Sequence, residues 1–564
     1  MSSANRSHLV PGEAEEAMHA SAPRSFDAVI VGAGFAGMYA LHRLRRLGFS
    51  ARVYEAGSGP GGTWYWNRYP GARCDVESLD YQYSFSDELQ REFTWRERYA
   101  TQPEILEYVN HVADRFDLRR DIQFETRVKG ASWDGATNRW TVETDRGERI
   151  SAKFFIAATG CLSAARVPEI KGLDTFEGPW YHTGRWPHEG VDLTGKRVGV
   201  IGTGSSGIQS IPILAEQASR LFVFQRTPNF SLPALNDKLS PERVREYKEN
   251  FEDIKRRARE TRTGILVNPN PESALEADPE EREREFNIRW EQGGFHLLQA
   301  YVDLLASVEA NETVAEFVRD KIREVVKDPS VAEALAPRDH PIGTKRICID
   351  TNYFQTFNRD NVTLVDIRTS PIEAITPKGL RTANGEYELD VIVFATGFDA
   401  MTGALLAMDI RGRDGVTLQQ KWAAGPRTYL GLSVAGFPNL FTITGPGSPS
   451  VLSNMIMSIE QHVDWIGETM HYLRHHQVDT IEAGVEAQDA WVAHVNTVAD
   501  RTLYPRANSW YLGANIPGKP RVFMPYVGGL GAYTEKCREV VMNGYEGFAL
   551  SGQPKILEWI APGV

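Results

Sequence analysis

Cysteine is scarce in this sequence. The 564 residues include four cysteines, Cys74, Cys161, Cys348 and Cys537, and no two of them form a Cys-x-x-Cys pair. This spacing argues against a cysteine-based zinc site and against a disulfide-reductase motif, and we predict no metal site. Scattered thiols are typical of buried, reduced side chains, so we expect a cytoplasmic protein.

A long apolar run suited to a membrane is also missing. The longest uncharged run, 428–459, contains Pro438, Pro446 and Pro449, which would interrupt a spanning helix. The first residues are polar and lack the basic and then apolar order of a secretory signal, so we expect a mobile leader over 1–25. The formal net charge of −12 argues against nucleic acid or an anionic membrane as a partner.

What the sequence does contain is two glycine-rich turns, each between a strand and a helix. The first unit has a predicted strand over 26–31, a helix over 35–47 and a second strand over 51–55. Its turn contains Gly32, Gly34 and Gly37. One glycine permits the tight turn, one lets the backbone approach a pyrophosphate, and one lets helix and strand pack closely. This order predicts a dinucleotide-binding βαβ unit.

A second unit of the same kind follows later in the chain. It has a predicted strand over 197–201, a helix to about residue 218 and a strand over 221–225. Its turn contains Gly202, Gly204 and Gly207. The start of each helix offers free amides and partial positive charge to phosphates. Two such units indicate two dinucleotides that exchange electrons.

The residue at the end of the second strand differs between the units. In the first it is Glu55, whose carboxylate accepts hydrogen bonds from ribose hydroxyls and repels a 2′-phosphate, which suits FAD. In the second it is Arg226, followed by Thr227, and a guanidinium suits the 2′-phosphate of NADPH. A solvated surface arginine is the alternative interpretation of Arg226. We therefore predict FAD and NADPH as cofactors.

The chain is expected to cross twice between the two nucleotide units. Apolar strands over 154–158 and 391–395 both run into Ala-Thr-Gly, which suggests that the first domain is interrupted and resumes near 390. Between them, charged helical segments dominate. Helix-start signals stand at Ser240, Asp278, Asn311 and Asp328.

The predicted fold class is α/β, with two Rossmann-like dinucleotide-binding domains and a helical insertion. The expected boundaries are 26–160 and 390–550 for the FAD domain, 165–235 and 340–389 for the NADPH domain, and 236–339 for the insertion.

The stretch FEGPWYHTGRWP at 176–187 narrows the family. It resembles the fingerprint F-x-G-x-x-x-H-T-x-x-W-P of the Baeyer–Villiger monooxygenases, flavoproteins that insert oxygen beside a ketone carbonyl. The matching residues are Phe176, Gly178, His182, Thr183, Trp186 and Pro187. Related flavin monooxygenases that oxidise amines and sulfides carry a looser version without this tryptophan. By this resemblance the fingerprint links domains near the cofactor, with His182 as a structural and dynamic element.

The resemblance covers nearly the whole chain after residue 25 and is closest to the phenylacetone and steroid monooxygenase branch. Further matching segments are 61–75, 202–209, 224–228, 343–346, 394–400, 445–454 and 509–523. The FAD contacts expected from the glycine motif and the resemblance are Gly32, Gly34, Gly37, Glu55, Gly62, Thr63, Trp64, Tyr65, Trp66, Asp75, Tyr81, Val128 and Met455. The expected NADPH contacts are Arg73, Cys74, Asp75, Thr203, Gly204, Ser205, Ser206, Gly207, Gln209, Arg226, Thr227, Lys345, Arg346 and Trp510.

The resemblance also implies the chemistry. NADPH reduces the flavin, the reduced flavin takes up O₂ as a flavin 4a-peroxide, and this anion attacks a ketone to give an ester or a lactone. A fixed cation keeps the peroxide deprotonated and stabilises the oxyanion that follows. Arg346 is implied as this cation and Asp75 as the residue that holds it. Ser450, Val451 and Leu452 are implied to border the ketone pocket; aryl, cyclic or steroid-like ketones are the implied substrates, and no protein partner is expected.

Several alternatives stay open. A flavin monooxygenase that oxidises sulfides or amines is the main one, followed by a two-dinucleotide reductase and a flavin-binding module. Individual residues also have simpler interpretations. Asp75 alone is typical of a surface acid, the pair Lys345-Arg346 of a solvated basic pair, and His182 of a hydrogen-bonded structural histidine. The aromatic cluster at 64–69 is in part simple core, and 450–452 is as readily a packed loop.

Overall fold

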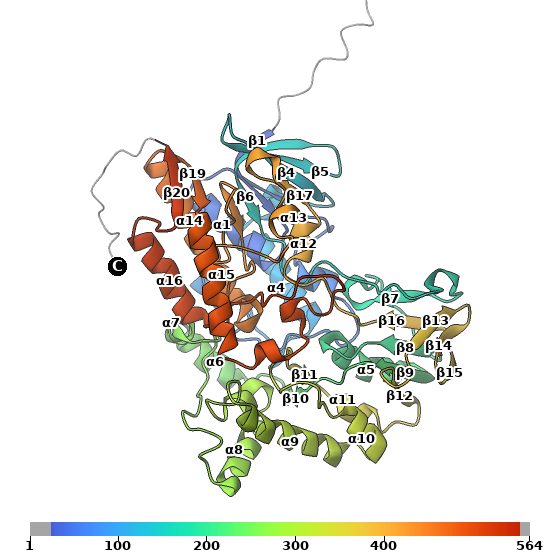
Figure 1. The fold of residues 1–564 in the computed structure, drawn as a ribbon. Coiled ribbons are helices and arrows are strands. Elements are labelled where there is room, and N and C mark those ends of the chain that lie inside the picture. Colours follow the sequence, from blue (N-terminus) through green and yellow to red (C-terminus); the bar gives the residue numbers. More distant parts are fainter. Residues whose placement is uncertain (1–23, 553–564) are drawn as a thin grey trace, which may run out of the picture.

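The computed structural model describes residues 24–552, and its two main sheets carry helices on their faces (Figure 1). The strands of the first sheet are β1 (Arg24–Val31), β2 (Ala51–Tyr54), β3 (Ile122–Gln123), β4 (Val128–Asp134), β5 (Arg139–Thr144), β6 (Arg149–Ala157), β17 (Asp409–Arg411) and β18 (Leu440–Thr442). Those of the second are β7 (Trp180–His182), β8 (Arg197–Ile201), β9 (Arg220–Gln225), β12 (Val362–Asp366) and β16 (Val391–Phe394). The first has the order β17-β4-β5-β6-β1-β2-β3 with β18 on β6, and the second the order β12-β9-β8-β16-β7.

The first predicted βαβ unit is confirmed. Strands β1 and β2 are parallel, and α1 (Phe35–Arg46) crosses between them. The helix buries one apolar face and packs against α14 (Met455–His475). Strand β1 begins at Arg24, so the last two residues of the expected leader belong to the sheet, and residues 1–23 lie outside the described part of the chain.

The second predicted unit is confirmed as well. Strand β8, α5 (Ser205–Gln217) and strand β9 follow one another, and the strands are parallel. The return to the first sheet differs from the expected boundary at 390. Strand β16 pairs with β8 in the second sheet, and the chain re-enters the first sheet only with β17.

The insertion is helical, as predicted. Its helices are α6 (Pro241–Glu249), α7 (Phe251–Glu260), α8 (Pro279–Gln292), α9 (Val308–Val325) and α10 (Pro329–Leu335). Ser240, Asp278 and Asp328 cap α6, α8 and α10, as expected. The predicted start at Asn311 is wrong, because Ser307 caps α9 one turn earlier. Asn311 lies inside the helix, and its amide donates to the carbonyl oxygens of Leu304 and Ile342 at 2.7 and 2.9 Å.

Smaller elements complete the fold. The short strands are β10 (Ser231–Pro233), β11 (Cys348–Asp350), β13 (Ile372–Thr376), β14 (Gly379–Thr382), β15 (Gly385–Glu388), β19 (Val478–Ala483) and β20 (Phe548–Gly552). The other helices are α2 (Thr63–Trp66), α3 (Asp87–Glu92), α4 (Gln102–Arg115), α11 (Tyr353–Thr356), α12 (Gly403–Leu406), α13 (Leu418–Lys421), α15 (Val485–Asp500) and α16 (Leu530–Met542). Within 24–552, no helix has the length and apolar character needed to cross a membrane.

The third glycine of the second turn has a packing role that can be tested. A Cβ at Gly207 would lie 2.4 Å from the carbonyl oxygen of Gly202, whereas a Cβ at Gly204 would meet no heavy atom within 4 Å. We expect Gly207→Ala to lower the free energy of unfolding by about 1–3 kcal/mol. The matched change Gly204→Ala should cost less than about 1 kcal/mol. Thermal unfolding checks this, and equal midpoints for the two variants would contradict it.

Candidate active site

A two-point ion pair joins Arg346 to Asp75. Nε of Arg346 donates to Oδ2 of Asp75 at 3.0 Å, and Nη2 donates to Oδ1 at 2.7 Å. The remaining amino group, Nη1, donates to the carbonyl oxygen of Val451 at 2.8 Å, and the guanidinium lies 5.3 Å from the ring centroid of Phe295. The planar fork of arginine matches a carboxylate in this way. These contacts fix the orientation of the cation.

The environment of the pair keeps Arg346 charged. Burial opposes the charged form, but the carboxylate of Asp75 outweighs it, so the pKa of Arg346 is raised above its ordinary value. The side chains of Arg346 and Asp75 nevertheless keep 26% and 23% of their surface exposed. A permanent cation therefore borders space in which a ligand can lie, and it can stabilise negative charge that develops there.

An apolar and aromatic cluster lies next to this pair. Its buried members are Cys161, Ala400, Met401, Val451, Ala499, Tyr504, Tyr511, Phe523, Met524 and Val527, and Leu452, Met455 and Trp510 pack against it. Of the residues expected near the flavin ring and the ketone, this cluster contains Val451, Leu452 and Met455. Ser450 is fully buried, and its Oγ contacts two members of the cluster, Sγ of Cys161 at 3.6 Å and Sδ of Met401 at 4.0 Å.

The loop that carries Ser450 has an unusual backbone. Ser450 has a φ of +43°, in the left-handed region that side chains other than glycine rarely adopt. The next carbonyl oxygen, that of Val451, is the one that binds Arg346. Such strain is often found at functional sites, and here it orients the carbonyl group of Val451 towards the guanidinium of Arg346.

On the side of the first glycine turn, Glu55 is buried and hydrogen-bonded. Its two carboxylate oxygens accept from the backbone N–H groups of Ala33 and Gly57, each at 2.7 Å. Because a carboxylate has further lone pairs, these bonds leave capacity for a ribose hydroxyl. The indole N–H of Trp64 donates to the hydroxyl of Tyr81 at 3.1 Å, which joins two of the expected flavin contacts.

The other residues expected to contact the flavin differ in hydrogen bonding, packing and burial. The hydroxyl of Tyr65 accepts from the backbone N–H of Ser58 at 3.0 Å, and its ring packs edge-on against His188. Val128 is buried at the start of β4. Gly62 has a left-handed φ of +53° and caps α2, which carries Thr63, Trp64, Tyr65 and Trp66.

On the side of the second glycine turn, the expected phosphate-binding cations lie near each other. Burial lowers the pKa of Lys345; the carboxylate of Asp339 opposes this shift, and the neighbouring positive charge of Arg226 adds to it. Asp339 is the nearest acid, with Oδ2 4.0 Å from Nζ of Lys345. Arg226 is exposed and forms no ion pair with any residue in 24–552. The hydroxyl of Thr203 donates to the carbonyl oxygen of Thr227 at 3.0 Å.

Two residues expected to contact NADPH are bonded to the protein. The guanidinium of Arg73 donates to Glu97 and to the carbonyl oxygen of Tyr99, both at 2.5 Å. The amide of Gln209 pairs with the backbone of Arg73. Cys74, between Arg73 and Asp75, is buried, and its sulfur accepts from the backbone N–H of Val76.

The fingerprint stretch forms the edge of the second sheet. Strand β7, which ends at His182, pairs with β16, and a Cβ at Gly178 would lie 2.4 Å from the carbonyl oxygen of Asp390. The hydroxyl of Thr183 donates to Ser206 in the first turn of α5 at 3.1 Å. Nδ1 of His182 accepts from the backbone N–H of Gly184 at 3.0 Å. The stretch therefore contacts the second nucleotide motif directly and does not touch Arg346.

The two glycine turns fit dinucleotide pyrophosphates. A Cβ at Gly34 would meet only the backbone of Gly62, with Cα at 3.4 Å and N at 3.7 Å, and a Cβ at Gly204 would meet no heavy atom within 4 Å. These two glycines cap α1 and α5, and within the described chain no side chain bonds the first amides of either helix. Free amides at a helix start bind phosphate. Residues 24–552 contain no group of three or more histidine, cysteine and acidic side chains that could bind a metal ion.

Sequence reasoning missed several residues that the structure places here. Phe295 comes from the insertion, where no motif marked it, and Tyr504 and Tyr511 lie in the aromatic cluster. Tyr511 had one available signal, its position beside Trp510 in a matching segment. Asp339 had none, because its role depends on a contact with Lys345 that only the fold creates.

Known proteins match this chain over most of its length. Residues 29–272 match the family model described as pyridine nucleotide-disulphide oxidoreductase. A Baeyer–Villiger monooxygenase of Pseudooceanicola batsensis is 46% identical over 524 residues, which is 92% of this chain and 95% of that protein. A phenazine N-monooxygenase of Lysobacter antibioticus is 43% identical over 533 residues, 94% of this chain and 98% of that protein. The solved structure of an oxidized steroid monooxygenase bound to NADP has a TM-score of 0.90 and 55% identity, and covers 94% of this chain and 100% of that one.

The buried fingerprint histidine gives a testable dependence of stability on pH. Burial, assisted by the charge of Arg185, lowers the pKa of His182 from 6.5 to about 4. The unfolded chain therefore binds a proton more readily between these values, and stability falls as the pH is lowered from 6.5 towards 4. Asparagine offers an oxygen close to the position of Nδ1 without titrating. We expect His182→Asn to show a smaller loss of thermal midpoint between pH 7.5 and pH 5 than the parent, whereas an equal loss would contradict this account.

Proposed function

This chain belongs to the Baeyer–Villiger monooxygenases, which contain FAD and depend on NADPH, and we propose that it inserts one oxygen atom of O₂ beside the carbonyl group of a ketone to give an ester or a lactone. The observation that supports this proposal best is the ion pair of Arg346 and Asp75 beside an apolar cluster. A fixed cation next to an apolar pocket suits a reaction in which oxygen carries negative charge.

The protein's part in this reaction is electrostatic. When bound, FAD supplies hydride acceptance from NADPH and activation of O₂. Arg346 stabilises negative charge on the attacking oxygen and on the former carbonyl oxygen of the ketone. Asp75 holds the guanidinium in one orientation and balances its charge, so that the guanidinium does not move to form an ion pair with another acidic side chain. The aromatic cluster excludes water, which strengthens the effect of Arg346.

In this proposal, each of the two main sheets binds one of the two cofactors. The first sheet and the strands that return to it, β17 and β18, hold FAD over the turn of Gly32, while the second sheet holds NADPH over the turn of Gly202. Arg226 and Lys345 bind the 2′-phosphate. This assignment is supported by the positive charge of Arg226 lying close enough to lower the pKa of Lys345, and by Arg226 forming no ion pair within residues 24–552.

The substrate proposed is a bulky apolar ketone, aryl, cyclic or steroid-like. Tyr504, Tyr511 and Phe523 line the region beside Arg346 with flat aromatic surface, which suits rings. The similar solved structure named as a steroid monooxygenase agrees with this class. Val451 and Leu452 border this region, and Ser450, the residue before them, has its hydroxyl against Cys161 of the same cluster.

Oxidation of a nitrogen or sulfur atom is the second candidate function. The relative named as a phenazine N-monooxygenase, 43% identical, is the observation that favours it. The same oxygen donor serves both reactions, but only ketone oxidation needs an anion stabilised by Arg346. Product analysis with a cyclic ketone and with a thioether of similar size separates the two.

The role of Arg346 can be tested by substitution. Arg346→Ala should leave the rate of flavin reduction by NADPH within about threefold of the parent, because hydride transfer does not need the cation. It should lower ester formation by about 100-fold or more, since the developing oxyanion loses its partner. Stopped-flow absorbance and chromatography of the products measure the two steps. Arg381→Ala, a surface change on β14, is the control, and full ester formation by Arg346→Ala would reject the assignment.

The proposed phosphate site predicts a change in cofactor preference. Arg226→Gln and Lys345→Gln should each raise the KM for NADPH by about tenfold, because each removes a charge that faces the 2′-phosphate. The KM for NADH should change by less than about twofold, because NADH lacks that phosphate. Steady-state kinetics with both nucleotides gives the ratio, and an unchanged preference in both variants would refute the site.

A further inference from the structure

Gln209 uses its side chain to bind another part of the protein. It lies in the second turn of α5, after the second glycine motif. Its Oε1 accepts from the hydroxyl of Tyr69 at 2.7 Å and from the backbone N–H of Arg73 at 3.3 Å, and its Nε2 donates to the carbonyl oxygen of Arg73 at 3.0 Å. One side chain therefore pairs with both backbone groups of Arg73, as a neighbouring strand would.

These partners fix the orientation of the amide. The N–H of Arg73 needs an acceptor and its carbonyl needs a donor, so Oε1 and Nε2 cannot exchange places. Burial raises the pKa of Tyr69, so its hydroxyl stays protonated and donates to the same oxygen. All three hydrogen bonds are therefore satisfied in one arrangement only.

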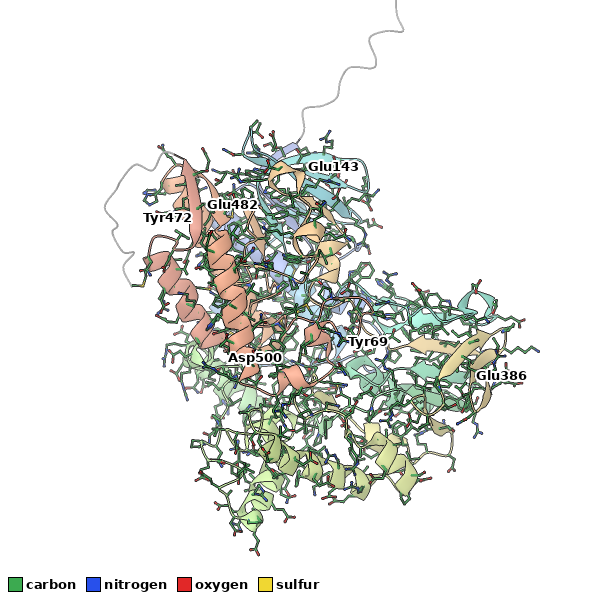
Figure 2. All side chains as sticks on the ribbon, in the orientation of Figure 1. Tyr69, Glu143, Glu386, Tyr472, Glu482 and Asp500 are labelled. Atoms are coloured by element: carbon green, nitrogen blue, oxygen red, sulfur yellow. The ribbon has the colours of Figure 1, made fainter. Side chains whose placement is uncertain are left out.

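The backbone of the same loop also lies directly against α5. Gly71 has a φ of +84°, and a Cβ there would lie 2.2 Å from the carbonyl oxygen of Gln209 and 3.2 Å from Cγ1 of Ile213. Only glycine permits this approach. Figure 2 shows Tyr69 where the part of the molecule that holds the first sheet meets the second sheet. Hydrogen bonding and close packing thus independently hold the loop 69–73 on α5.

The loop held in this way carries Asp75. Asp75 follows Arg73 by two residues and makes the two-point contact with Arg346. About one turn before Gln209, α5 begins at the open turn of Gly204, the site proposed for the pyrophosphate of NADPH. A continuous set of contacts therefore runs from this turn through Gln209 and the backbone of Arg73 to the Asp75–Arg346 pair.

We propose that Gln209 is a positioning residue that holds the Asp75 loop on α5, so that the phosphate-binding helix and the Asp75–Arg346 pair keep one fixed relation. This inference rests on the function proposed for that pair. It assigns Gln209 to the protein's own framework, in place of the nucleotide contact expected from its motif. Loss of the contact leaves both cofactors bound but lets Asp75 drift, so that Arg346 supports oxygen transfer less well and more of the NADPH yields hydrogen peroxide.

Gln209→Met tests this, because methionine keeps the length of the side chain and removes all three hydrogen bonds. FAD content and the rate of flavin reduction by NADPH should stay within about twofold of the parent. The ester formed per NADPH consumed should fall by about threefold to tenfold, with a matching rise in peroxide. Gln217→Met, at the far end of the same helix, is the matched control and should leave this ratio unchanged. Tyr69→Phe removes one of the three bonds and should give a smaller fall, which keeps the test available if Gln209→Met folds poorly.

A double-mutant cycle with Asp75→Asn separates positioning from general damage. If Gln209 acts through Asp75, the double variant should form no less ester per NADPH than Asp75→Asn alone. Additive losses, or an unchanged ester yield in Gln209→Met while Asp75→Asn is impaired, would overturn the inference and leave the proposed function standing. A full ester yield in Asp75→Asn itself would overturn both.

Discussion

The contact between Asp75 and Arg346 is the interaction on which the rest of the site depends. The two residues are 271 positions apart in the sequence and join the loop after α2 to the segment before β11. A guanidinium in such a partly buried place would cost several kcal/mol if left without a partner, and the carboxylate removes that cost. The pair forms only when the parts of the chain that build the two sheets are packed together, so it couples the chemistry to the completed fold.

Several segments that are distant in the sequence orient the guanidinium of Arg346. The insertion contributes Phe295, the loop before α14 contributes the carbonyl oxygen of Val451, and α5 holds the Asp75 loop through Gln209. The fingerprint stretch acts at a different place, on the edge of the second sheet and against the first turn of α5 through Thr183. It identifies the family without contributing a side chain to the pair. The helical insertion, in turn, does more than cover the fold, since it supplies the ring beneath Arg346.

The sequence alone predicts the βαβ units well, because their signals are local. An apolar strand, a glycine turn and a helix follow one another at 26–47 and again at 197–218, and the structure has both units. Features that depend on contacts with segments far along the chain are not predicted correctly from the sequence. Strand β16 could not be placed in the second sheet, because a buried apolar strand does not reveal its neighbour. The start at Asn311 was wrong because its side chain bonds two carbonyl groups from other segments. For the site, Arg346 and Asp75 come from the family resemblance, whereas Phe295 and the hydrogen bonds of Gln209 with the backbone of Arg73 follow only from the folded contacts.

The proposed function requires that this site transfer one oxygen atom of O₂ to a ketone. The most direct measurement supplies the holoenzyme with NADPH, a bulky cyclic ketone and ¹⁸O₂, and determines the isotope content of the product by mass spectrometry. We expect an ester or lactone that carries one ¹⁸O atom for each NADPH productively used. Consumption of NADPH with hydrogen peroxide as the only oxygen product across a panel of aryl, cyclic and steroid-like ketones would contradict it.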